Sequence, residues 1–364
     1  MSWPWLDIFY ALIAFEAFVF ALVLVALARR LGVRFGFVDA VNPAKIHEKP
    51  MVRCGGAGIF AAFMLALGAD IVLARVLKNA VFVPDEIRNY LGNIGFVGGK
   101  LTALIAGAVI LFVTGLVDDR RNLRPGVKLL LQIIAALPLV LAGVRIKFFI
   151  PGDFLGALLT IGWIVLLANA FNFIDNMNGL SAGVALFAAL NFYLISRGGN
   201  EYFMMAIFAL FIGSLAGFLP HNFPRARLFM GDSGSMFIGY MLAALSTLVT
   251  YYRAGVPTQL PVVAPLIVLG VPIFDTVSVL LIRWRRGLPL MKGDQNHFSH
   301  RLAALGFTRV QTVLIIYLIT FTVGLTAVNL RWLDWAGAAL ALLQAVLFFV
   351  VIFLLEHAGR EKKT

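Results

Sequence analysis

Acidic and amide side chains gather in three short segments at the ends of long apolar runs. The segments read GLVDDRR at 115–121, NAFNFIDNMNG at 169–179 and FMGDSGS at 229–235. The chain holds only 18 Asp and Glu, whereas 61% of its residues are hydrophobic. A carboxylate beside apolar surface loses its hydration at a large cost unless a cation, a donor or a substrate compensates. The placement therefore predicts an enzyme that works at a membrane surface.

The first segment ends in an acidic pair, Asp118 and Asp119, and basic residues that include Lys128 follow it. Adjacent residues on a helix point about 100° apart, so the two carboxylates are expected to serve different roles. The functional interpretation is a metal or acid–base site, with Lys128 available for a phosphate. The alternative is a helix end with solvated charges.

In the second segment Asn169, Asn172, Asp175 and Asn178 recur every third residue. This spacing drifts by about 60° per step around a helix, so we expect a helix end that bends through a polar turn before Gly179. Amide and carboxylate oxygens ligate cations, and amides also recognise the edge of a nucleobase. The alternative is polar packing between helices within the membrane.

The third segment opens an apolar run with Asp232 and Ser233. Ordinary N-capping by either residue is the simpler interpretation. The functional one adds a cation on Asp232 and helix amides that face an anion. Upstream, HEKPMVRCGG ends in Gly55 and Gly56, which indicate either close helix packing or, with their basic neighbours, an anion site.

A basic loop near 283–301 ends in HFSHR. His297 and His300 are expected to meet on one helix face. A zinc pair is disfavoured because no third soft ligand accompanies them, whereas two imidazoles and Arg301 suit a diphosphate. A juxtamembrane basic patch on anionic lipid would explain the arginines but not the histidine spacing. Asp275, inside the preceding apolar run, has no assigned partner.

The elements that position these residues are apolar helices. Only 13% of the 364 residues are charged, against roughly a quarter in soluble domains, so the chain is predicted to be an all-α integral membrane protein. It is read as one domain, 1–364, and its single cysteine excludes an internal disulfide. About eleven (10–11) spans of suitable length are expected. They lie near 7–28, 54–75, 100–117, 127–144, 154–171, 179–196, 202–220, 233–251, 261–282, 309–328 and 333–355.

The basic residues define a topology. If the connections alternate between the two sides, 21 of the 30 Lys and Arg fall on one side, which also holds the polar segments. The positive-inside rule then places the N-terminus outside and the C-terminus and active site in the cytoplasm of a cell membrane. The net charge of +12 is thereby explained without nucleic acid. A transporter would instead place polar groups near mid-membrane.

Together the segments resemble the polyprenyl-phosphate N-acetylhexosamine-1-phosphate transferases, in the bacterial undecaprenyl-phosphate GlcNAc-1-phosphate transferase-like branch of glycosyltransferase family 4. The resemblance covers roughly 45–305, with HEKPMVRCGG, GLVDDRRNLRPGVK, NAFNFIDNMNGLSAG, FMGDSGS and HFSHRL in the family's order. It implies transfer of a sugar 1-phosphate from a UDP-sugar to a membrane polyprenyl phosphate, with release of UMP. It also implies a requirement for Mg²⁺ or Mn²⁺.

The resemblance also implies residue roles. Asn172 and Asp232 match the expected metal ligands, and Asp118 and Asp119 match the acidic pair that activates or positions the acceptor phosphate; which of the two acts as a base is open. With Asp232, that pair forms the expected catalytic set. The expected substrate-binding residues are Lys128, His297, His300 and Arg301 near the diphosphate, Asn178 at the nucleoside, and Lys49, Arg53 and Asp175.

Two departures from the family refine the expected substrate. Many bacterial members have Asp-Gly-Leu-Asp-Gly where this chain has DNMNG at 175–179, so Asn178 keeps a pairing edge but loses a charge. HFSHRL is closer to the GlcNAc-type branch than to the muramyl-pentapeptide branch. We therefore expect a UDP-N-acetylhexosamine donor and the initiating step of a cell-envelope glycan of O-antigen, capsule or teichoic-acid type.

Alternative functions are a phospho-N-acetylmuramoyl-pentapeptide transferase, a lipid-linked glycan flippase and a structural scaffold. The identity of the sugar is left open, as is assembly into a homodimer.

Overall fold

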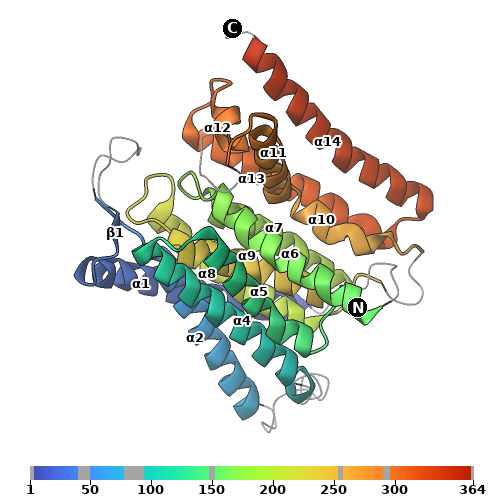
Figure 1. Cartoon of the computed structure of the whole chain (residues 1–364). Coiled ribbons are helices and arrows are strands. Elements are labelled where there is room, and N and C mark those ends of the chain that lie inside the picture. The colour runs from blue at the N-terminus through green and yellow to red at the C-terminus, as the bar shows by residue number, and fades with distance from the viewer. Residues whose placement is uncertain are drawn as a thin grey trace.

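The computed structural model describes residues 4–39, 50–77, 94–146, 152–252, 257–289 and 296–361. These residues form a bundle of helices (Figure 1). The helices are α1 (Pro4–Arg34), α2 (Gly55–Leu77), α4 (Ile94–Arg121), α5 (Pro125–Leu141), α6 (Asp153–Ile174), α7 (Leu180–Gly198), α8 (Tyr202–Asn222), α9 (Gly231–Leu248), α10 (Ala264–Val268), α11 (Gly270–Arg285), α12 (Phe298–Ala303), α13 (Arg309–Asn329) and α14 (Trp335–Glu361). Two 3-10 turns, η1 (Leu260–Val263) and η2 (Leu330–Trp332), precede α10 and follow α13. The prediction of an all-α membrane protein is confirmed.

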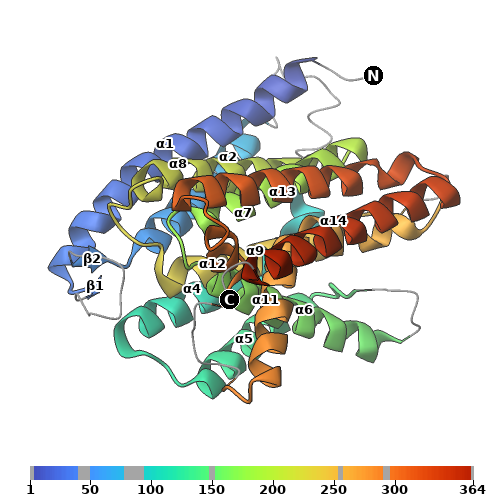
Figure 2. The same ribbon diagram turned by 90° about the horizontal axis from the view of Figure 1, so that it is seen from above.

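A short antiparallel pair of strands, β1 (Val38–Asp39) and β2 (Met51–Val52), follows the end of α1. Val38 pairs with Val52 and Asp39 with Met51. Figure 2 shows both strands beyond the end of α1 opposite the N-terminus. The strand pair continues through Arg53, which bridges to Phe229 in the segment before α9. The chain entering α2 is therefore tied to the start of α9.

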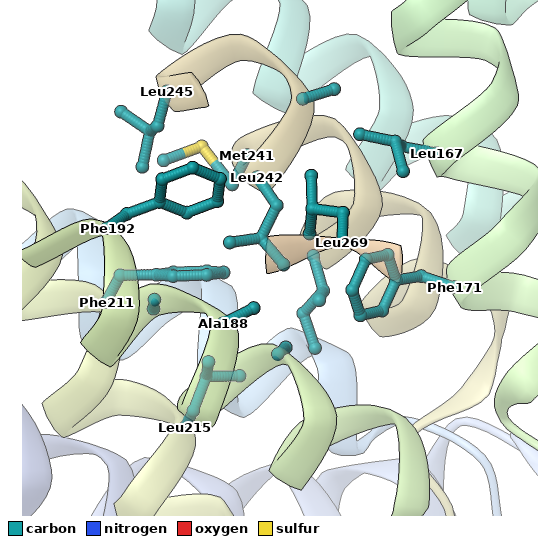
Figure 3. Packing of buried hydrophobic residues seen from close by; sticks show 14 of the residues in the cluster. Leu167, Phe171, Ala188, Phe192, Phe211, Leu215, Met241, Leu242, Leu245 and Leu269 are labelled. Carbon is teal, nitrogen blue, oxygen red and sulfur yellow. The ribbon is translucent and has the colours of Figure 1, made fainter. Parts of the chain in front are cut away.

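Helix α9 lies in the centre of the bundle. Every residue from Ser233 to Ser246 is buried, and α2, α4, α6 and α7 all pack against it. Figure 3 shows part of this core, where Met241, Leu242 and Leu245 of α9 face side chains from α6, α7 and α8. A helix surrounded by protein can be apolar on all sides. Its N-terminus is therefore fixed relative to four neighbouring helices.

Close backbone contact explains one glycine pair of the sequence. A methyl group on Gly56 would collide with the backbone of Gly234, so α2 and α9 touch where both helices begin. The N–H groups of Gly55 and Gly56 donate to the carbonyls of Phe229 and Met230 at 2.9 and 2.8 Å. This geometry supports the packing interpretation of the glycine pair, since these two amides are already used.

The expected count of eleven spans is not confirmed. Within the described ranges, eight helices are long and apolar enough to cross a membrane, or nine if the bent pair of α10 and α11 is one span. Two of the expected spans correspond to α5 and α9, which are not among the eight. Helix α5 has only 17 residues, and α9 begins with the polar sequence GDSGS.

The expected span over 261–282 is broken. The chain turns by 67° between η1–α10 and α11. Pro272 lies in the first turn of α11, and because proline has no N–H and its ring crowds the carbonyl four residues earlier, the helix cannot continue straight from α10. The break gives α11 its own direction, with Asp275 facing the interior at 1% exposure.

Candidate active site

Four helix ends meet at the site. Helix α4 ends at Arg121, α5 begins at Pro125, α6 ends at Ile174 and α9 begins at Gly231. The side chains predicted from the first three segments lie at these ends. Residues that are about 115 positions apart in the chain thus come within hydrogen-bonding distance.

Asp119 holds the first turn of α9. Its Oδ1 accepts a hydrogen bond from the N–H of Asp232 at 2.7 Å, and its Oδ2 accepts one from the N–H of Ser233 at 3.1 Å. These amides would otherwise lack partners at the helix start, where the helix dipole also favours a negative charge. The anion expected at this helix start is therefore a carboxylate of the chain itself.

The simpler interpretation of the third segment, in which Asp232 or Ser233 is the N-cap of the helix, is wrong. Helix α9 begins at Gly231, after Met230, whose side chain makes no cap, so Asp232 and Ser233 lie inside the first turn. Gly231 has a φ of +76°, and a methyl group there would approach Asp119 Oδ2 to 2.6 Å. A glycine is needed because both the left-handed backbone and the carboxylate exclude a side chain.

Asp118 has a different partner. Lys128 Nζ forms ion pairs with Asp118 Oδ2 and, at 3.1 Å, with Asp232 Oδ2. The other oxygen of Asp118 accepts a hydrogen bond from the N–H of Leu123 at 2.7 Å. The adjacent carboxylates therefore have separate partners, as the helix geometry predicts. The interpretation of Asp118 as a solvated helix end is wrong, because its side chain is only 2% exposed.

Asn172 joins this cluster from α6. Its Nδ2 donates to Asp232 Oδ1 and to Ser235 Oγ, both at 3.0 Å. Asn169, one turn earlier, instead exchanges hydrogen bonds of 2.7 and 3.2 Å with the side chain of Gln132 in α5. The packing interpretation therefore holds for Asn169, whereas Asn172 faces the acidic cluster.

The cluster suits a hard divalent cation in its donor chemistry. The carboxylates of Asp118 and Asp232 share the single ammonium group of Lys128, and Asp119 bonds the backbone N–H of Asp232, so carboxylates outnumber the ammonium group. In the described part of the chain, no three His, Cys, Asp or Glu side chains could hold a metal. Ligation here would rely on the Asp232 carboxylate, the Asn172 amide oxygen and oxygens of a bound phosphate, a set that Mg²⁺ accepts.

The polar turn predicted after the second segment is confirmed. Helix α6 ends at Ile174 and α7 starts at Leu180. The N–H of Gly179 donates to Asn222 Oδ1, and Tyr317 donates its hydroxyl proton to the carbonyl of Gly179, each at 2.5 Å. Asn178 is exposed and donates to the carbonyl of Pro224 at 3.4 Å. The turn is thus clamped while Asn178 faces outward, free to meet a ligand edge.

Asp175 lies in this turn close to the acidic cluster. Burial, together with the negative charges of Asp232 and Asp119, raises the pKa of its carboxyl from 3.8 to about 8, while the charge of Arg53 opposes this rise. Asp175 and Arg53, both predicted to bind substrate, therefore interact electrostatically with the same centre. Lys49 lies outside the described residues.

The HFSHR segment is anchored to α11. His297 Nδ1 lies 2.8 Å from Asp275 Oδ2, and the N–H of Phe298 donates to Asp275 Oδ1 at 2.5 Å. The expectation that His297 and His300 share a helix face is wrong, because α12 begins at Phe298 and His297 is its extended N-cap.

Other contacts tie this segment to neighbouring elements. Ser299 donates to Asn176 Oδ1 at 2.6 Å, and the rings of Phe173 and His297 are 6.2 Å apart. Arg301 is buried; its guanidinium donates to Ser278 Oγ at 2.9 Å and to the carbonyl of Asn296. These contacts show Arg301 holding the segment in place, while His300 is only half-buried.

Several residues of the site escaped the sequence interpretation. Asn222 and Tyr317 clamp Gly179, and Asp275 holds His297. Asp275 carried the clearest sequence signal, as a carboxylate inside an apolar run. The other two look like ordinary polar residues of apolar helices and gain their roles only through contacts distant in sequence.

Comparisons with known proteins agree with this geometry. The glycosyl transferase family 4 profile matches residues 101–250. The chain is 32% identical over 341 residues to the probable undecaprenyl-phosphate N-acetylglucosaminyl 1-phosphate transferase of Bacillus subtilis (strain 168), covering 92% of this chain and 87% of that protein.

Other relatives carry similar names. A decaprenyl-phosphate N-acetylglucosaminephosphotransferase of Mycobacterium tuberculosis (strain CDC 1551 / Oshkosh) is 33% identical, over 85% of this chain and 79% of its own length. The undecaprenyl-phosphate alpha-N-acetylglucosaminyl 1-phosphate transferase of Salmonella typhi is 26% identical, over 94% of this chain and 90% of its own length.

Proposed function

Because the chain belongs to glycosyl transferase family 4, among the polyprenyl-phosphate N-acetylglucosamine-1-phosphate transferases, we propose that it transfers N-acetylglucosamine 1-phosphate from UDP-N-acetylglucosamine to undecaprenyl phosphate. An oxygen of the acceptor phosphate attacks the sugar-bearing phosphorus of the donor. The P–O bond to UMP breaks, and the new diphosphate stays on the lipid. One phosphoanhydride replaces another, so catalysis consists mainly of positioning and charge neutralisation.

The observation that supports this reaction best is the charge cluster at the four helix ends. Lys128, held between Asp118 and Asp232, presents an ammonium group where phosphates would enter. Asp119 fixes Asp232 by bonding its backbone N–H. Such fixed charges cost no reorganisation when the reaction occurs, which is the usual source of electrostatic catalysis.

The acceptor itself needs little activation. A phosphate monoester is largely dianionic at neutral pH, because its second pKa is about 6. We therefore assign Asp118 and Asp119 to positioning: Asp118 orients Lys128, and Asp119 orients the start of α9.

Asn172 and Asp232 would hold the divalent ion, which we take to be Mg²⁺ or Mn²⁺. When bound, such an ion neutralises the donor diphosphate and the charge that develops on the leaving UMP. The Asn172 amide now donates to Asp232 Oδ1, and a half-turn of that amide would present its oxygen instead. Lys128 already pairs with one oxygen of Asp232, so the ammonium and the ion would together neutralise this carboxylate.

The membrane placement follows from the same chemistry. UDP-sugars are cytosolic, and the side of the chain rich in Lys and Arg carries all the segments of the site. We therefore place the site and the C-terminus in the cytoplasm and the N-terminus outside, in a cell membrane. The product would initiate a cell-envelope glycan.

The test is an assay of the purified protein with undecaprenyl phosphate, Mg²⁺ and a panel of UDP-sugars, following UMP release and label transfer to lipid. We expect transfer from UDP-N-acetylglucosamine, dependent on the acceptor and abolished by a chelator. Transfer only from UDP-N-acetylmuramoyl-pentapeptide would identify the other branch, and transport without UMP release would refute a transferase. Asp232→Asn should raise the Mg²⁺ concentration needed for half-maximal rate, whereas Asp153→Asn, an exposed acid paired with Arg145, should leave it unchanged.

A further inference from the structure

Asp275 is a buried carboxylate that the reaction described above does not use. It lies in α11 at 1% exposure, and both of its oxygens accept hydrogen bonds from one segment. Oδ2 lies 2.8 Å from His297 Nδ1, and Oδ1 accepts the N–H of Phe298 at 2.5 Å. A charged group buried this deeply is normally retained for a specific partner.

The pairing fixes the chemistry of the His297 ring. Because a carboxylate can only accept, Nδ1 must carry a proton, and Nε2 is then the nitrogen that can meet a ligand; it donates to a phosphate oxygen when a second proton completes the imidazolium. Carboxylate–histidine pairs commonly hold an imidazole in one tautomer and orientation in this way. His297 is itself only 5% exposed, so its ring has little freedom to rotate.

The same face of α11 also holds the end of the segment. Ser278, three residues after Asp275, accepts from Arg301 Nη2 at 2.9 Å and donates to the carbonyl of Asp275 at 3.0 Å. Further along the segment, Ser299 bonds Asn176 of the turn after α6. The segment 297–301 is thus hydrogen-bonded on one side to α11 and on the other to the turn that follows α6.

We propose that Asp275 is a positioning residue that sets the tautomer and orientation of His297, so that Nε2 faces the donor diphosphate. The identity of that ligand rests on the proposed function, whereas the Asp275–His297 relation does not. Asparagine is not equivalent to aspartate here, because it offers one acceptor and places an NH₂ group against the second donor.

The first test is independent of activity. Selective ¹⁵N labelling of histidine gives at most five ring systems, because the chain has five histidines, and His297→Gln assigns the relevant one. We expect one set of His297 ring signals with Nδ1 protonated in the wild type, and more than one set in Asp275→Asn. Thr276→Val is the matched control, since the buried Thr276 hydroxyl bonds only Pro272 of its own helix among the described contacts. An unchanged His297 spectrum in Asp275→Asn would overturn the proposal.

The second test is a double-mutant cycle in the transferase assay. Asp275→Asn and His297→Gln should each lower kcat/KM for the donor by ~10- to 100-fold, with KM for the lipid acceptor unchanged. Since Asp275 acts through His297, the double variant should be no worse than His297→Gln alone. Additive losses would refute the positioning role.

Asp275→Glu keeps both acceptor oxygens and should recover part of the activity lost in Asp275→Asn; equal loss in the two variants would also count against the proposal. If Asp275→Asn fails to fold, Asp275→Ser, which removes both carboxylate oxygens, takes its place in both tests. If the wild type transfers no sugar phosphate, the proposed function fails, yet the His297 spectra still decide the proposal.

Discussion

At the scale of single residues, the site depends on which carboxylate meets which donor. Asp118 and Asp119 are neighbours in sequence, yet one binds an ammonium group and the other two backbone amides. The helix sends adjacent side chains about 100° apart, which separates their partners. Neutralising either acid should therefore give a different defect.

The Asp118–Lys128 pair allows a test by rescue. Lys128→Met leaves the nearly buried Asp118 without its cation, which should lower the free energy of unfolding by about 1–3 kcal/mol. The loss is smaller than for a fully buried pair because water reaches the partly exposed lysine. Adding Asp118→Asn should restore most of this stability but not the activity, since Lys128 is still missing. Thermal unfolding in detergent and the UMP assay measure the two effects. A double variant no more stable than Lys128→Met would contradict the pairing.

Asp175 gives a prediction for pH. Its pKa of about 8 in the fold exceeds the 3.8 of an unperturbed carboxyl, so between these values the folded state binds more protons than the unfolded state. Its contribution to stability is therefore largest at low pH and is lost as the pH rises toward about 8. In a chelator, the wild type should lose stability relative to Asp175→Asn as the pH rises from ~4 to ~8. A melting-temperature difference independent of pH would rule this out.

At the scale of elements, the start of α9 fixes the positions of the acidic groups in the site. This buried helix carries Asp232, and the N–H of Asp232 donates a hydrogen bond to Asp119. Its geometry depends on a left-handed residue at Gly231. The helix start, more than any single side chain, places the acidic groups relative to Asn172.

Gly231→Ala tests this dependence. The left-handed backbone costs alanine about 1–2 kcal/mol, and the methyl group would displace the Asp119 carboxylate. We expect a marked loss of activity with a moderate loss of stability. Gly162→Ala, in α6 with no atom near the added methyl, should be neutral or slightly stabilising. Full activity in Gly231→Ala would show that the Asp119 contact is dispensable.

At the scale of the whole molecule, the helices bring all the described parts of the site to one end of the bundle. Helix α13 begins shortly after α12, on the side of the site, and runs to Asn329. The connection between α13 and α14 therefore lies one helix length away from the site. Opposite ends of a spanning helix face different compartments.

Cysteine labelling can test the orientation. The only native thiol, Cys54, is buried, so introduced cysteines should dominate the reaction. In intact cells a membrane-impermeant thiol reagent should label Asp334→Cys, between α13 and α14, but not Arg124→Cys, beside the site. Wild type reports the background from Cys54. The reverse pattern would invert the topology.

The sequence by itself determined the class of protein and most of the candidate site residues. Long apolar stretches predict helices in lipid, because no other local structure satisfies the backbone there, and the acids at their ends stand out against that background. A helix end that bends through a polar turn before Gly179 also followed from residue spacing. Local periodicity and composition are properties of the chain and need no tertiary contact.

Only the tertiary structure decided how those residues divide the work. It assigned Asp119 to the amides of α9, Asp118 to Lys128, Asn169 to Gln132 and Asp275 to His297. Against eleven expected spans, the described residues contain eight helices that could cross a membrane and one bent pair. Each of these outcomes depends on which helices meet in space, because a contact between two different elements leaves no trace in the residue spacing of either one.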